Sequence, residues 1–148
     1  MLTVESDEHF MRMALIEAQR AYDLNEVPVG AVIVSAGRII ARAHNLTEQL
    51  NDVTAHAEML AFTAASEFMG SKYLWDCTLY VTLEPCIMCA GAAFWTQMDR
   101  IVFGASDEKR GFRNADSPIL HPKTKLEGGL LADESVVMLQ DFFRKLRS

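Results

Sequence analysis

The chain has 148 residues, which suits one domain covering residues 1–148, and half of its residues are hydrophobic, enough to bury a core. Its formal net charge of -6 argues against a protein whose whole surface binds nucleic acid, although a local basic patch is compatible with it. No apolar run approaches the ~18 residues that span a bilayer, and the acidic start lacks the apolar segment of a signal peptide. These features predict a cytoplasmic protein with no membrane association.

The first predicted element is a helix that begins after Ser6 and ends near Asn25. The Ser6 side chain can cap the first turn, and the acidic Asp7 and Glu8 favour the positive end of the helix dipole. The residues that follow are good helix formers with a broad apolar stripe, as expected for a helix packed on a core.

The rest of the chain alternates between predicted strands and helices. Segments rich in valine and isoleucine predict strands, with a hairpin between the first two, at residues 27–35, 39–43, 77–82 and 100–104. Helical propensity predicts helices at residues 55–69, 86–95 and 131–147. Strands separated by helices favour an α/β fold in which helices cover both faces of a mixed sheet.

Local signals place the ends of two of these helices. Thr54 is the predicted cap and Gly70 the predicted stop of the helix at 55–69. Pro85 precedes the helix at 86–95, a position where proline is well tolerated. Residues 105–125 lack clear periodicity, and so long a loop inside a compact domain is often functional.

Cys86 and Cys89 form a C-x-x-C pair in the first turn of a predicted helix. Their spacing places both thiols on one side of the helix, and a helix N-terminus lowers thiol pKa values toward the thiolate that metals bind. The pair therefore indicates a site for a soft or borderline cation. A redox pair and two small core cysteines are the alternative interpretations.

His56 lies at the start of another predicted helix, and helix N-termini gather at one end of an α/β sheet. With Cys86 and Cys89 it would supply three ligands to zinc and leave the fourth position open to water, as in catalytic sites. A fourth protein ligand would instead indicate a structural site. Three other side chains could supply it: Cys77, His44 and His121.

Glu58 follows His56 by two residues, so the two side chains do not share a helix face. Glu58 can therefore approach the water in the open position without joining the ligands, and it can act as a general base. An ordinary helix glutamate is the alternative interpretation. The apolar flanks argue against it, because a buried carboxylate needs a partner.

Together these motifs resemble the zinc-dependent nucleobase and nucleoside deaminases, whose signature is H-x-E followed by P-C-x-x-C. They read HAE at 56–58 and PCIMC at 85–89. Within that superfamily the chain looks most like the bacterial tRNA-specific adenosine deaminases, over nearly its whole length. The segments that carry this resemblance are EVPVGAV (26–32), Asn45, TAHAEM (54–59), TLYVTLEPCIMCAGA (78–92), RIVFGASDEKRG (100–111), and LADE and DFFR within 131–144.

The resemblance implies a three-layer α/β/α cytidine deaminase-like fold, with a mixed central sheet of about five strands and helices on both faces. It implies conversion of adenosine to inosine at the wobble position of a tRNA anticodon, with one zinc ion per subunit held by His56, Cys86 and Cys89. Glu58 would take a proton from water and deliver protons to the ring nitrogen and the leaving amine, while hydroxide attacks C6 of adenine. Family members are typically homodimers whose sites border the subunit interface, so a second copy of the chain is an expected partner.

The resemblance also implies a surface for a tRNA anticodon stem-loop. Asn45 would hydrogen-bond the target nucleotide, and the backbone around Ala57, Glu84 and Pro85 would lie near the reacting group. Five basic and three acidic residues between positions 106 and 125 agree with an RNA partner. Four side chains are the expected RNA contacts: Asp107, Lys109, Phe143 and Arg144. Of the adjacent Phe142 and Phe143, one is expected to pack in the core.

Two segments depart from the pattern of the tRNA-acting relatives. Phe94 and Trp95 replace an aliphatic residue and a histidine, and an aromatic pair here also occurs in relatives that act on free guanine; residues 112–125 differ as well. The alternative function is deamination of a free base or nucleoside, such as guanine, adenine or cytidine, at the same zinc site. A third interpretation is a non-catalytic zinc-binding module, which predicts a closed site with four ligands and a dispensable Glu58.

Overall fold

The structure is a computed structural model that describes residues 6–147. Its elements, in chain order, are α1 (Asp7–Asp23), β1 (Gly30–Ser35), β2 (Arg38–His44), α2 (Ala57–Met69), β3 (Cys77–Leu83), α3 (Ile87–Thr96), β4 (Arg100–Ala105), a short 3-10 helix (Phe112–Asn114), β5 (Lys125–Glu127) and α4 (Ala132–Arg147). The oxygen of the Ser6 side chain accepts a hydrogen bond from the His9 N–H at 3.1 Å, so the predicted cap of the first helix is confirmed.

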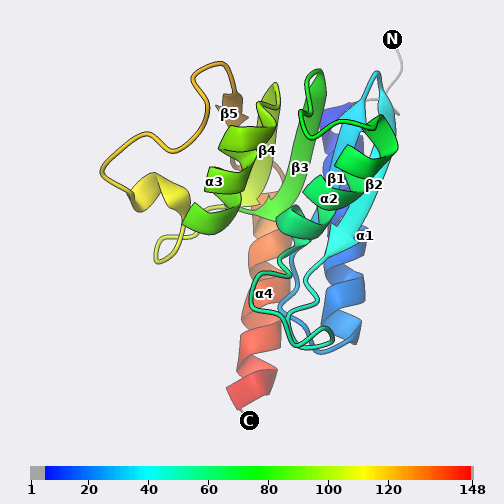
Figure 1. The fold of residues 1–148 in the computed structure, drawn as a ribbon. Coiled ribbons are helices and arrows are strands. Elements are labelled where there is room, and N and C mark those ends of the chain that lie inside the picture. The colour runs from blue at the N-terminus through cyan, green and yellow to red at the C-terminus, as the bar shows by residue number, and fades with distance from the viewer. Residues whose placement is uncertain (1–5, 148) are drawn as a thin grey trace.

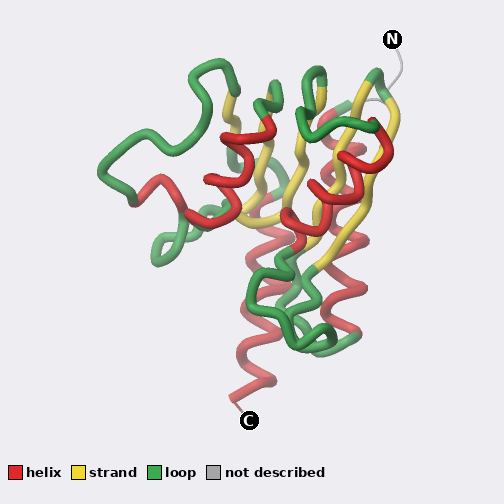
Figure 2. Tube along the Cα trace, in the orientation of Figure 1, coloured by secondary structure: helices red, strands yellow, loops and turns green. Residues whose placement is uncertain are grey.

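Five strands form one mixed sheet in the order β2-β1-β3-β4-β5. β1 pairs antiparallel with β2 and β3, whereas β4 pairs parallel with β3 and β5. Helices α2 and α3 lie on one face of the sheet and α1 and α4 on the other, as Figure 1 shows and the tube in Figure 2 repeats. The predicted three-layer α/β/α fold with a mixed sheet of five strands is therefore confirmed.

Alternate side chains of the central strands enter two separate cores. In β1, Ala31 and Ile33 pack with α2 and α3, whereas Val32 and Val34 pack with α1. β3 and β4 repeat this alternation. Because both faces of these strands are buried, they read in the sequence as continuous apolar runs, which is why their prediction was straightforward.

The start of α2 differs from the sequence prediction. Thr54 is not its cap: the helix begins at Ala57, and His56 is the residue that precedes it. The N–H and the hydroxyl of Thr54 instead donate to Asp52 Oδ1, at 2.8 and 2.7 Å, and close a turn ahead of the helix. The predicted stop is confirmed, since Gly70 ends the helix in the left-handed conformation with a φ of 67°.

Residues 105–125 contain little regular structure, as their lack of periodicity predicts. The 3-10 helix interrupts the segment, and β5 follows at its end as a strand of 3 residues. This strand pairs with Arg100, Ile101 and Val102 of β4, but no apolar run marks it in the sequence. Within residues 6–147, none of the helices is long and apolar enough to cross a membrane.

Helix α1 crosses β1 at Gly30 with no room for a side chain. A Cβ atom added to Gly30 would lie 2.0 Å from the carbonyl oxygen of Ala14 and 2.4 Å from the backbone nitrogen of Ala18. Both alanines are buried at this crossing. Small residues on both elements therefore set the distance between this helix and the sheet.

We expect Gly30→Ala to lower the free energy of unfolding by about 3 kcal/mol, because backbone atoms rather than a flexible side chain must move. Urea unfolding followed by circular dichroism measures the change. Gln19→Ala, at an exposed position of the same helix, is the control and should change the free energy by less than about 0.5 kcal/mol. Equal stabilities of Gly30→Ala and the control would contradict the packing described.

Candidate metal centre

The candidate metal ligands lie at the N-termini of two neighbouring helices. His56 directly precedes α2 and Cys86 directly precedes α3; both have an extended backbone, and neither side chain caps its helix. Cys89 follows in the first turn of α3. Helices α2 and α3 contact each other on the same face of the sheet, so these side chains converge (Figure 1).

The distances between these side chains fit a zinc ion. His56 Nδ1 lies 3.7 Å from Cys86 Sγ and 3.6 Å from Cys89 Sγ. A zinc ion bonded at about 2.1 Å to nitrogen and about 2.3 Å to sulfur would hold these atoms about 3.6 Å apart at a tetrahedral angle. The His56 nitrogen therefore already lies at the distance from both sulfur atoms that tetrahedral zinc requires, and all three ligand atoms lie within 4.8 Å of one another.

The charges of the two thiols also favour a cation. A hydrogen bond from the Cys89 thiol, together with the nearby His56 ring, lowers the pKa of Cys86 to about 4 although partial burial opposes the shift. The Cys89 thiol donates its proton to Cys86, and this hydrogen bond together with burial raises the pKa of Cys89. A metal ion takes the place of such a proton when thiolates bind it.

The candidate fourth ligands lie in other environments. The Cys77 thiol, on a fully buried residue of β3, donates to the carbonyl oxygen of Trp75 at 3.5 Å. His44 pairs with the buried Glu17 at 3.0 Å. His121 accepts a hydrogen bond from the backbone N–H of Lys123 at 3.2 Å. Within residues 6–147, the one group of three or more metal-binding side chains is His56, Cys86 and Cys89, so the closed site required by the non-catalytic module finds no support.

Glu58 lies in the first turn of α2 and its side chain is buried, with the residue 4 % exposed. Burial raises the pKa of Glu58 to about 7, although the nearby His56 and a hydrogen bond from the Cys89 thiol oppose the shift. The carboxyl group therefore lies beside the metal ligands without being one of them. A pKa near neutrality suits a group that must both accept and return a proton.

Asn45 is tied to the start of α2. Its side-chain oxygen accepts a hydrogen bond from the Ala57 N–H at 2.8 Å, which satisfies one of the unpaired donors at the helix N-terminus. This bond fixes the orientation of the amide, so the side-chain NH₂ group remains as the donor for other partners. Ala57 itself is fully buried.

Glu84 lies between β3 and the metal ligand Cys86, and its carboxylate bonds to the loop that follows β4. It accepts hydrogen bonds from the N–H groups of Asp107 and Arg113 and from the Arg113 guanidinium. Burial would raise the pKa of Glu84, but these donors hold it below its ordinary value. The pairing of Glu84 with Arg113 was not predicted from the sequence, although a buried carboxylate at a strand end signals the need for a cation.

Asp107 closes a turn in the same loop. Its Oδ1 accepts hydrogen bonds from the N–H groups of Lys109 at 3.1 Å and Arg110 at 3.0 Å. The side chains of Lys109 and Arg110 are exposed. Asp107 therefore supports the loop through its carboxylate, while the two cations face solvent.

Helix α4 carries the remaining predicted RNA contacts and extends past the end of the sheet (Figure 1). Phe142 is buried against Tyr22, with ring centroids 6.0 Å apart, whereas Phe143 is 39 % exposed. The expectation that one of the two phenylalanines packs in the core is therefore confirmed. Arg144 donates to Asp141 at 3.0 Å. The RNA contacts of Phe143 and Arg144 stay predictions.

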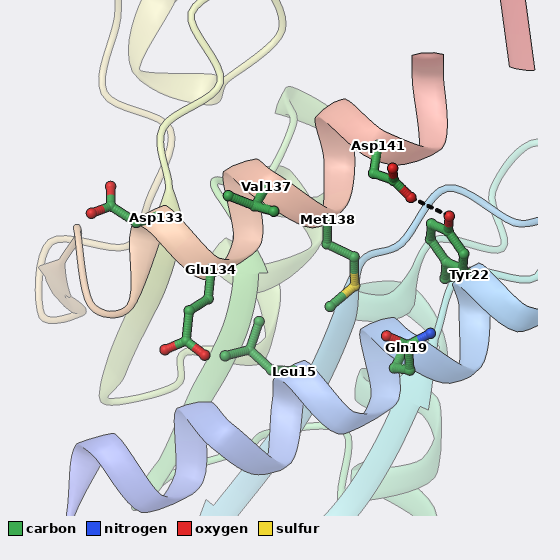
Figure 3. Close-up of a pocket in the computed structure, with 8 residues that line it drawn as sticks. All are labelled: Leu15, Gln19, Tyr22, Asp133, Glu134, Val137, Met138 and Asp141. Atoms are coloured by element: carbon green, nitrogen blue, oxygen red, sulfur yellow. Dashed lines mark hydrogen bonds between the residues drawn. The ribbon is translucent and has the colours of Figure 1, made fainter. Parts of the chain in front are cut away.

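A hollow with a volume of about 620 Å³ lies on the face of the sheet opposite the metal ligands (Figure 3). It runs between α1 and α4 and is lined by Leu15, Gln19, Tyr22, Asp133, Glu134, Val137, Met138 and Asp141. Two of its three carboxylates already have partners, since Glu134 pairs with Arg12 and Asp141 with Tyr22. The chemistry therefore resides at the helix N-termini rather than in this hollow.

The family model of the cytidine and deoxycytidylate deaminase zinc-binding region matches residues 4–105. The chain belongs to this deaminase family. The match includes all three metal ligands and Glu58, so the zinc ion expected from the sequence is also the metal of the family.

Individual relatives show which members of this family the chain resembles. The deaminase is 47% identical over 146 residues to the tRNA-specific adenosine deaminase of Aquifex aeolicus (strain VF5), a match that covers 95% of this chain and 96% of the relative. A solved structure from studies of A-to-I editing by tRNA:A34 deaminases is similar with a TM-score of 0.83 and 44% identity, over 88% of this chain and 99% of that one. The guanine deaminase of Bacillus subtilis is similar over less of the chain, with a TM-score of 0.66, 38% identity and coverage of 68% and 65%.

We expect the purified deaminase to hold one zinc ion per chain, and His56→Ala to lose it, because two thiolates alone leave the tetrahedral set incomplete. Glu58→Ala should keep the ion, since this carboxylate is not a ligand. Elemental analysis after gel filtration measures the metal. Cys77→Ala is the control that removes a thiol outside the ligand group, and loss of zinc from this folded variant would contradict the assignment.

Proposed function

We propose that this deaminase converts adenosine to inosine by hydrolysis at the wobble position of a tRNA anticodon, and that residues 1–148 act as a single domain. The observation that carries the proposal is the 47% identity, over nearly the full length of both chains, to a tRNA-specific adenosine deaminase. The converging His56, Cys86, Cys89 and Glu58 supply the chemistry that such a reaction needs. Because its substrate would be tRNA, we place the protein in the cytoplasm.

The chain's own residues divide the work of the reaction. Zinc, when held by His56, Cys86 and Cys89, lowers the pKa of a water molecule. Glu58 takes a proton from this water and delivers protons to the ring nitrogen and to the departing amine, so that water and adenosine become inosine and ammonia. The buried position of Glu58 beside the three ligands, without being one of them, supports this assignment.

Asn45 would position the nucleotide through its side-chain NH₂ group. Its oxygen already accepts from Ala57, which leaves the donor end for an acceptor atom of the substrate. The backbone of Ala57, Glu84 and Pro85 would line the reacting group. The Ala57 N–H is engaged by Asn45, so Ala57 would contribute shape rather than a donor.

The anticodon stem-loop would lie against the loop after β4 and the C-terminal part of α4. Lys109 and Arg144 would contact phosphates, and the half-exposed Phe143 would stack on an unpaired base. Asp107 would act through the turn that it closes. Opposite charge near the phosphates can support binding although the net charge of the chain is -6.

We further propose that the deaminase is a homodimer with one zinc ion per subunit. The outer face of α3 supports this proposal, because large apolar side chains are exposed there: Ile87 at 54%, Met88 at 36% and Trp95 at 74%. A contiguous apolar surface beside a site is typical of a protein–protein interface. A second copy of the chain covering this face would bring residues of the partner close to the metal ligands.

Deamination of free guanine is the second candidate function, favoured by the similarity to a guanine deaminase and by the aromatic pair of Phe94 and Trp95. In α3, however, Trp95 lies eight residues beyond Ile87, or about 12 Å farther along the helix. Phe94 contacts Trp95 and His121 rather than the metal ligands. The position of Trp95 at the far end of α3 from Cys86 argues against a role for its ring in selecting a base in its own subunit.

We expect the zinc-loaded enzyme to form inosine in an anticodon stem-loop RNA with adenosine at the wobble position, and to leave free guanine, adenosine and cytidine unchanged. Chromatography of the digested products measures the conversion, which should fall steeply with salt because phosphate contacts release counterions. Glu58→Gln is the control that should bind zinc and RNA without deamination. Turnover of a free base with an inert RNA would contradict the proposal.

We expect Trp95→Lys to convert the dimer into monomers, because it places a charge in the apolar face of α3. The substitution should not disturb the fold of the subunit, since Trp95 is 74% exposed. Sedimentation velocity measures the assembly. Val137→Lys, at a residue of α4 that is 65% exposed, is the matched control and should leave the dimer intact. An unchanged dimer in Trp95→Lys would place the interface elsewhere.

A further inference from the structure

The carboxylate of Glu84 accepts four hydrogen bonds, and all of them come from one loop. Its side chain is 3% exposed, and four donors reach it: the N–H of Asp107 at 3.0 Å, and the N–H, Nε and Nη2 of Arg113 at 3.1, 3.1 and 3.0 Å. All four donors belong to the segment 106–113, which we name the β4 loop. One buried charge therefore fixes both ends of this loop.

The β4 loop also contacts the turn that presents a metal ligand. The N–H of Phe112 donates to the carbonyl oxygen of Pro85 at 2.9 Å, and Gly111 pairs with Cys86 as an isolated β-bridge. A Cβ atom added to Gly111 would lie 2.3 Å from the carboxyl carbon of Glu84. The loop is therefore in direct contact with the backbone on which Cys86 sits.

Arg113 is held by its surroundings on several sides. Besides Glu84, its guanidinium donates to Ser106 Oγ at 2.8 Å and lies over the ring of Phe103, 4.7 Å from the ring centroid. These contacts use the planar shape of the guanidinium as well as its charge, and a lysine cannot reproduce them. Although the Arg113 side chain is 46% exposed, these contacts direct its guanidinium toward Glu84, Ser106 and Phe103.

We propose that Arg113 is a positioning residue of the deamination site: together with Glu84 it holds the β4 loop against the turn that carries Cys86, while Lys109 and Arg110 of that loop contact the RNA. Only the part of this inference that concerns RNA contacts rests on the proposed function. Arg113 lies in the segment 112–125 that departs from the pattern of the tRNA-acting relatives, so part of this departure serves to hold the loop in place rather than to read a different substrate.

The first test separates a positioning cation from an RNA-binding one. Arg113→Lys keeps the charge but loses the bidentate and stacked contacts, so we expect it to lower kcat by about 10-fold and to leave the salt dependence of RNA binding unchanged. Lys109→Gln should instead weaken RNA binding and reduce the slope of log affinity against log salt by about 1. Single-turnover kinetics and binding titrations at several salt concentrations measure both.

Amide hydrogen exchange gives a readout that needs no substrate. In Arg113→Lys and in Glu84→Gln, the amides of Asp107, Phe112 and Arg113 should exchange faster than in the parent protein, whereas Lys109→Gln should leave them protected. Elemental analysis should find one zinc ion in Arg113→Lys, because all three ligands remain. Should Glu84→Gln fail to fold, Arg113→Lys and Arg113→Gln carry the test.

The outcomes are distinguishable from a failure of the proposed function. If the parent enzyme deaminates only a free base, Lys109 has no role in RNA binding. The value of kcat on that base and the rates of amide hydrogen exchange still test the positioning role of Arg113. Wild-type kcat and exchange in Arg113→Lys and Arg113→Gln would overturn the inference. So would a reduced salt slope with unchanged kcat in Arg113→Gln, since this would make Arg113 a phosphate contact.

Discussion

The convergence of two helix N-termini on one point is the constraint on which the rest of this structure depends. His56 precedes α2 and Cys86 precedes α3. His56 Nδ1 and Cys86 Sγ must stay about as close as their present 3.7 Å for one ion to bind both. Neither residue can set that distance alone. The sheet sets it, because α2 and α3 pack on the same face of the sheet and begin at the same end of it (Figure 1). The fold therefore determines the geometry of the metal site.

Two buried carboxylates shape the loops around this point by the same physical means. Glu84 satisfies donors of the β4 loop, and Glu26, which is fully buried, accepts from the Thr47 hydroxyl and from the N–H groups of Glu48 and Gln49. In each case an acceptor in the core satisfies donors of an irregular segment that has few backbone partners of its own. Such loops keep a defined shape without becoming regular structure, as a binding surface requires.

The parts of the structure that could be predicted from sequence are those governed by local or periodic signals. Apolar runs predicted the strands that are buried on both faces, and Ser6 and Gly70 marked the ends of two helices. The spacing of the ligand motifs identified the metal site. Thr54 was misassigned because its hydroxyl has a competing acceptor in Asp52. β5 and the pairing of Arg113 with Glu84 were missed because β4 and Glu84 are distant in sequence from their partners, and no local pattern records such a pairing.

The crossing of α1 and β1 at Gly30 has a consequence for the engineering of new specificities. A contact with no space for one methyl group makes this crossing intolerant of larger side chains. The exposed side chains of the loop of residues 45–55 and of the β4 loop, such as Val53 and Lys109, take no part in this contact and can vary without moving the sheet. Libraries that seek altered substrates should therefore concentrate their diversity in these two loops and keep the small residues of α1 and β1 invariant.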